Sequence, residues 1–134
     1  MSNRLDDALR FNQTALNLRA ARQELLASNI ANADTPNFKA KDIDFGNALK
    51  QVMSGSNAKL QMAATASAHL GGNEGKTVMG APVKYRVATQ PSADGNTVDM
   101  DVERAQFADN ALRYEASVKF VSDDIKQLLT VIQG

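Results

Sequence analysis

The sequence contains no cysteine and no tryptophan, and aromatic residues make up only 5% of its 134 residues. The lack of cysteine excludes a disulfide framework, a thiolate metal site and a cysteine nucleophile. Fifteen basic and fifteen acidic residues give a formal net charge of zero. A neutral chain offers no electrostatic attraction for nucleic acid. We therefore expect neither a nucleic-acid-binding protein nor a disulfide-stapled one.

Long hydrophobic runs are also missing. No stretch of 18 apolar residues occurs, so we expect no direct membrane insertion. The first ten residues include Asp6 and Asp7, whereas a secretory signal has a basic start that leads into an apolar run. We therefore expect that, if the chain leaves the cytoplasm, it does so without a cleaved signal peptide.

The clearest pattern that is present lies in the C-terminal segment 101–134. Its apolar residues alternate in steps of four and three, which is the heptad spacing of a helix that packs along one narrow stripe. Acids four residues before bases, as in Asp109 and Arg113, support the exposed faces by about 0.2–0.5 kcal/mol each. The stripe consists of Phe107, Ala111, Tyr114, Val118, Val121, Ile125, Leu128 and Ile132.

The N-terminal segment 1–33 has the same periodicity and no glycine or proline before Pro36. It is rich in good helix formers, so we expect a second long helix. Two striped helices at opposite ends of a small chain can bury their stripes together. We therefore predict a mainly α fold, in which the two terminal helices pack as an antiparallel-type coiled coil. On the N-terminal side this stripe includes Leu9, Leu16, Leu25 and Ile30.

Between the helices, three shorter parts are expected. Residues 34–53 read as a turn, an extended segment and a short helix for which Asp44 is available as N-cap. Residues 54–82 are rich in Gly, Ser and Ala, which favours a flexible middle. Residues 83–100 alternate on either side of Asp94-Gly95, the strongest hairpin signal in the chain, and predict a small β-hairpin.

Candidates for chemistry are weak. The run 71–77 ends like a phosphate-binding loop, but its first glycine is misplaced. His69 has no nearby acid or second ligand, and the pairs Asp42/Asp44 and Asp99/Asp101 suit solvated faces or N-caps better than an ion site. We therefore assign no catalytic, cofactor-binding or metal-binding residue and expect no enzyme and no small-molecule substrate.

Asn29 leaves two readings open. It lies on the core track of the N-terminal helix, where a buried amide can set helix register or partner choice. Asparagine is also common where a helix frays and stops. The residues alone favour neither reading.

The run 27–38, Ala-Ser-Asn-Ile-Ala-Asn-Ala-Asp-Thr-Pro-Asn-Phe, resembles the signature shared by the bacterial flagellar axial proteins of the rod and hook. The runs 41–45, 94–101 and 106–110 narrow the resemblance to proximal rod subunits. By position, the post-helix family motif falls on Asn29, Asn32, Thr35, Pro36 and Phe38.

The resemblance implies a structural subunit of the periplasmic rod, which stacks helically through its terminal helices, transmits torque and surrounds the export channel. It implies export through the flagellar type III secretion apparatus. The implied partners are further copies, other rod proteins, the rod-base and export-gate adaptor, and the membrane ring. The two stripes described above would then form the assembly seam. We expect the terminal helices to be largely disordered in the dilute monomer and to become ordered on assembly. An alternative with the same stripes is a coiled-coil adaptor or chaperone of a secretion system, which should form a closed, stable dimer.

Overall fold

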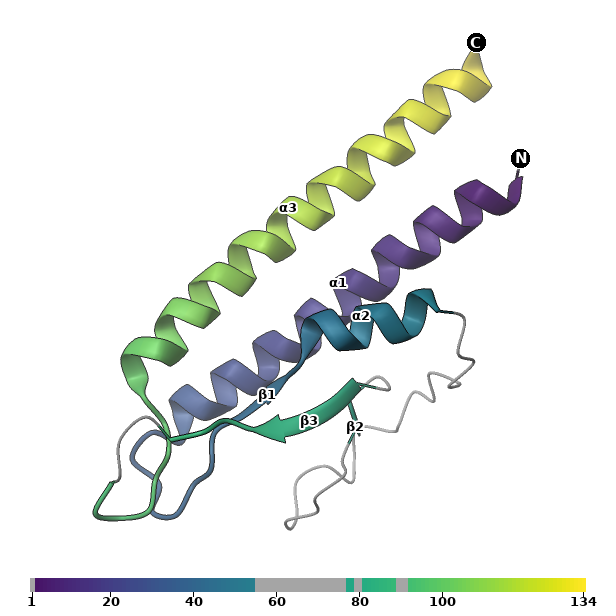
Figure 1. Ribbon diagram of the computed structural model, residues 1–134. Coiled ribbons are helices and arrows are strands. Elements are labelled where there is room, and N and C mark those ends of the chain that lie inside the picture. Colours follow the sequence, from purple (N-terminus) through teal and green to yellow (C-terminus); the bar gives the residue numbers. More distant parts are fainter. Residues whose placement is uncertain (1, 55–76, 79–80, 89–91) are drawn as a thin grey trace.

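A computed structural model describes residues 2–54, 77–78, 81–88 and 92–134. Two long helices, α1 and α3, lie side by side and antiparallel, so that both chain ends lie at the same end of the pair (Figure 1). The strand β1 and the helix α2 both pack on α1, which places α1 between α3 and α2. In chain order the elements are α1 (Ser2–Ala31), β1 (Lys41–Ile43), α2 (Phe45–Met53), β2 (Thr77–Val78), β3 (Ala81–Tyr85) and α3 (Met100–Gln133).

These elements confirm the predicted fold class. The protein is mainly helical, its terminal helices pack against each other, and a short helix and a small antiparallel hairpin lie between them. The helix ends follow from local chemistry. Asp99 is the N-cap of α3, where its carboxylate accepts hydrogen bonds from the backbone N–H groups of Asp101 and Val102.

The predicted position of the hairpin is wrong. In the three-stranded sheet of order β1-β3-β2, β3 pairs antiparallel with both neighbours, with Ile43 opposite Val83 and Val78 opposite Ala81. No strand follows Asp94-Gly95, because Asp99 caps α3 and the helix begins at Met100. The alternation after Gly95 therefore belongs to a loop and the first turn of a helix, and the turn at Gly95 leads the chain back to the end of α1.

The apolar core lies where α1, α2 and the sheet meet. Leu18 and Ala21 of α1 contact Ile43, Ala48 and Ala81 there, and Leu25, Phe45 and Leu49 close its edge. Among the described residues the buried apolar side chains are few and mostly small: Leu18, Ala21, Leu26, Ala40, Ile43, Ala48 and Ala81. Only three of these are large, at about 1.5–3 kcal/mol of transfer free energy each. The contact between α1 and α3 lies outside this core.

Two expectations concern residues outside the described ranges. The flexible middle falls largely on 55–76 and 79–80. His69 and most of the loop that resembles a phosphate-binding motif lie there too, so both remain predictions.

Candidate assembly site

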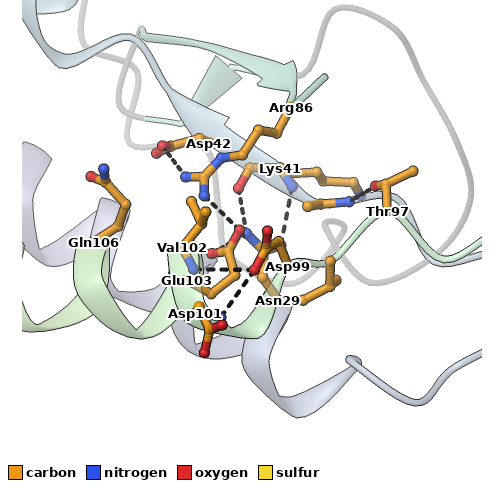
Figure 2. A network of polar contacts seen from close by, with 12 residues as sticks. Asn29, Lys41, Asp42, Arg86, Thr97, Asp99, Asp101, Val102, Glu103 and Gln106 are labelled. Atoms are coloured by element: carbon orange, nitrogen blue, oxygen red, sulfur yellow. Dashed lines mark hydrogen bonds and ion pairs between the residues drawn. The ribbon is translucent and has the colours of Figure 1, made fainter. Parts of the chain in front are cut away.

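A glutamate without solvent exposure lies at the base of the helix pair, in the first turn of α3. The Oε1 atom of Glu103 accepts a hydrogen bond from Arg86 Nη1 at 2.6 Å, and its Oε2 accepts one from Asn29 Nδ2 at 3.1 Å (Figure 2). Asn29 also donates to the Lys41 carbonyl at 2.8 Å and accepts from the Lys41 amide at 3.0 Å. Asn29 is therefore a satisfied, buried amide, and the frayed-end reading does not hold.

A second carboxylate extends this network. Asp42 accepts two hydrogen bonds from Arg22, at 2.9 and 3.1 Å, and forms an ion pair with Arg86. Arg22 also donates to Gln106 Oε1 at 2.9 Å, which reaches α3 again. The charges alternate from Arg22 through Asp42 and Arg86 to Glu103 and cancel. We call the five residues Arg22, Asn29, Asp42, Arg86 and Glu103 the clamp.

The charged groups of the clamp are partly buried, and this affects the pKa of Asp42. Burial would raise the pKa of Asp42, but the hydrogen bonds and positive charge of Arg22, together with Arg86, outweigh burial and lower that pKa below its usual value. The Asp42 carboxylate therefore stays charged between its two guanidiniums. Removing one member of a buried ion pair leaves its partner unpaired, at a cost of about 3–5 kcal/mol.

A second polar contact joins the helices one heptad further along α3. Asn110 is fully buried, and its Nδ2 donates to the Arg19 carbonyl at 2.9 Å and to Gln23 Oε1 at 2.7 Å. Together with the pair Asn29–Glu103, this contact places polar groups at two consecutive heptad positions of the same face. The base of the pair is therefore polar.

Asn96 closes the C-terminal end of α1. Its side-chain Nδ2 donates to the carbonyls of Asn32, Ala33 and Thr35 at 2.8–2.9 Å. These carbonyls belong to the turn that follows α1, so an amide from elsewhere in the chain satisfies backbone groups that no regular structure pairs. The sequence segments 32–38 and 94–97, which carry two of the family-like runs, are thus one unit.

Backbone hydrogen bonds also join the segments 32–38 and 94–97. Asn37 donates its N–H to the Asp94 carbonyl at 2.9 Å, and Thr97 donates its N–H to the Phe38 carbonyl at 3.0 Å. The hydroxyl of Thr97 then accepts from the Ala40 amide at 2.8 Å. The loop before α3 is therefore fixed to the loop after α1.

Gly95 is required in this unit, and replacing it should destabilise the protein. Its φ is +76°, and a Cβ there would lie 2.5 Å from Asn37 Oδ1. We expect Gly95→Ala to lower the free energy of unfolding by about 1–3 kcal/mol, measured by urea denaturation. Gly46→Ala is the control, because Gly46 lies in α2 and a Cβ there would meet only Asp44 Oδ1, at an ordinary contact distance of 4.0 Å. It should raise stability by about 0.5–1 kcal/mol, and equal effects of the two changes would contradict the assignment.

The residues of the post-helix motif lie in this region, mostly in contacts within the chain. Asn29 belongs to the clamp, Asn32 donates to the Ser28 carbonyl, and Thr35 donates its hydroxyl to Asn32. Phe38 is half-buried and Pro36 is exposed. The motif thus shapes the turn that joins α1 to β1, and any contact of it with a neighbouring molecule stays a prediction.

The predicted assembly seam is only partly covered within one chain. Half of its α3 residues, namely Phe107, Ala111, Val121 and Leu128, are half-buried, as are Leu9, Leu16, Leu25 and Ile30 of α1. The face that α3 buries most deeply carries Glu103 and Asn110, so the apolar stripe is turned to one side of α1. We call the large apolar residues left exposed along that side the exposed stripe: Tyr114, Val118, Ile125, Leu129 and Ile132.

Of the polar residues at the base, the sequence pointed to Asn29 and missed Glu103 and Asn110, which are both fully buried. One signal was available. Glu103 and Asn110 are seven residues apart and fall in step with the three–four pattern of α3, so a helical repeat with polar members could have marked them.

The acidic pairs have ordinary structural roles. Asp44 accepts a hydrogen bond from the Asn47 amide in the first turn of α2, and Asp99 caps α3. Among the residues that the structure describes, no group of three His, Asp or Glu side chains is arranged to hold a metal ion. Within the same residues, no helix combines the length and the apolar character needed to cross a membrane.

The chain is thus a helix pair with a polar base, most of whose polar groups are paired within the chain, and with a stripe of exposed apolar side chains along α3. The pattern of the family described as "Flagella basal body rod protein" matches residues 9–39. The flagellar basal body rod protein FlgB of Escherichia coli (strain K12) is 50% identical over all of this chain and 99% of the relative. FlgB of Salmonella typhimurium is 49% identical over the same shares, and FlgB of Buchnera aphidicola is 35% identical over the full length of both.

Identity at this level along the whole length shows the family. The chain belongs to the FlgB family of flagellar basal body rod proteins.

Proposed function

We propose that this chain is a structural subunit of the flagellar basal body rod and joins its neighbours through the exposed stripe of α3. The observation that carries the proposal is that stripe: five large apolar side chains are 39–80% exposed along one side of a 34-residue helix. Contiguous apolar surface of this kind marks a contact with another molecule. Contacts that do not close on themselves generate a helical tube.

The partners are other components of the rod. As the resemblance of the run 27–38 to flagellar axial proteins implies, they include further copies of the chain, the rod-base and export-gate adaptor, and the membrane ring. The place is the periplasmic part of the basal body, reached through the flagellar secretion apparatus. The role is structural and not enzymatic.

Assembly also completes the fold. The buried apolar side chains among the described residues are three large residues and four alanines, and all of them belong to the half of the molecule near the clamp. The distal turns, residues 2–12 of α1 and 118–133 of α3, contribute none. Ordering one residue costs about 1–2 kcal/mol of backbone entropy, so these turns depend on contacts from neighbouring molecules.

Hydrogen exchange with solution mass recorded alongside tests this proposal. In the dilute chain we expect fast amide exchange in the distal turns and slow exchange around Leu18, Leu26 and Asn29, which are almost fully buried. As large oligomers form, the distal turns should become slow. A fixed dimer mass, with slow exchange along both helices at every concentration, would contradict a rod subunit.

A further inference from the structure

The apolar seam of α3 cannot by itself fix where α3 lies along α1. Its residues repeat every seven positions, so a slide of α3 by one heptad puts an apolar residue in the place of each one it displaces. Tyr114 would take the place of Phe107, and Val118 that of Ala111. The slide would also bring more of the apolar C-terminal turns of α3 alongside α1. Apolar burial therefore does not oppose it.

The polar contacts at the base do oppose it. Glu103 and Asn110 are themselves one heptad apart, so the same slide puts the Asn110 amide in the place of the Glu103 carboxylate. Arg86 would then lose its contact at 2.6 Å with Glu103, and Asn29 would lose an acceptor. Ser117 would replace Asn110 beside Gln23. Its side chain is shorter than that of Asn110, so it could not reach Gln23 Oε1, to which Asn110 donates at 2.7 Å. Buried polar groups without partners are strongly disfavoured.

We propose that Glu103, Asn110 and their partners are positioning residues that select one of several apolar-equivalent registers of the helix pair. In the selected register the last turn of α3 extends past the start of α1 (Figure 1). Val131 and Ile132, which are 78% and 80% exposed, stay uncovered there. The register thus decides how much of the apolar helix face the chain offers to others. This inference concerns the single chain and does not depend on the proposed function.

Disulfide formation between engineered cysteine pairs reports the register. Because the sequence contains no other cysteine, no competing disulfide can form. The contacts of Asn29 with Glu103 and of Gln23 with Asn110 define an antiparallel register, which carries Leu16 to the level of Ser117, one heptad beyond Asn110. Leu16→Cys with Ser117→Cys therefore reports the native register. Leu16→Cys with Asp124→Cys reports the register after a slide of one heptad.

Each reporter is oxidised in dilute solution in the native background and in a background with Glu103→Leu, Arg86→Leu and Asn110→Leu. The triple change removes both charged partners of the Glu103–Arg86 ion pair, so neither charge is left buried without its partner. We expect the yield of the slipped reporter to rise about tenfold for each polar contact removed, since an unsatisfied buried group shifts an equilibrium by about that factor. The native reporter should lose yield in parallel.

The control removes an exposed ion pair of the same helix, Asp109 with Arg113, whose side chains are 49% and 61% exposed. Asp109→Leu with Arg113→Leu should leave both reporter yields unchanged. A folded triple variant that forms only the native disulfide would overturn the proposal, because the loop contacts of Asn96 would then fix the register alone. If the triple variant lacks helical circular dichroism, Asn110→Leu decides, since it leaves the ion pairs in place: a smaller rise of the slipped reporter supports the proposal, and no rise overturns it.

Discussion

Glu103→Ala is expected to destabilise the protein by about 3–5 kcal/mol, because the guanidiniums of Arg22 and Arg86 would then share the single carboxylate of Asp42. Glu103 is fully buried, and its partner Arg86 is 21% exposed. Asn29, 1% exposed, would lose an acceptor as well. Since small domains are stable by only about 5–15 kcal/mol, this single change should shift the urea midpoint of unfolding strongly. Circular dichroism in a urea titration measures it.

The matched control is Glu115→Ala, because Glu115 is an exposed glutamate of the same helix. Surface changes of this kind stay within about 0.5 kcal/mol. A second comparison is Glu103→Leu combined with Arg86→Leu. It should be less harmful than Glu103→Ala, because it removes both charged partners and leaves less unpaired. Equal effects of Glu103→Ala and Glu115→Ala would show that the clamp contributes nothing to stability.

Ile125→Asp is expected to abolish rod assembly while it leaves the single chain folded and exported. Ile125 lies in the middle of the exposed stripe and is 45% exposed. In the free chain the new carboxylate can remain hydrated, so stability should change little. In a helix contact between molecules the same carboxylate would be buried without a partner, at a cost of several kcal/mol. Flagellation and swimming of a strain that carries only this variant measure the effect.

Gln127→Asp is the control for that experiment. It adds the same charge two residues away, at an exposed position of α3 outside the stripe, and should preserve flagellation. Secretion of both variants into the medium is measured alongside, to separate an assembly defect from an export defect. Normal flagella with Ile125→Asp would show that the stripe is not an assembly surface.

The two parts of the molecule have different tasks in this account. At the base, the clamp and the Asn96 contacts satisfy most of their polar groups within the chain. Along the distal turns, the apolar side chains are left without enough cover. The division explains how one subunit can hold a defined shape near its loops and still offer a helix face to neighbours.

The sequence was sufficient for the elements that depend on local pattern. The heptad spacing of 101–134 and the unbroken helix formers before Pro36 correspond to α3 and α1, and Asp44 precedes α2 as a cap. It failed at the hairpin, because Asp94-Gly95 is a turn signal that says nothing about which segment lies beside the chain afterwards. In the structure that segment is the end of α1, held by Asn96.

The sequence by itself determined that two long helices form at the ends of the chain, that cysteine chemistry is excluded, and that the post-helix run follows the first helix. Only the tertiary structure decided which residues of α3 face α1. Glu103 is buried because Arg86 and Asn29, 17 and 74 residues away in sequence, meet it there. A helical repeat fixes which residues share a face, but the choice between two adjacent faces rests on partners that only folding brings together.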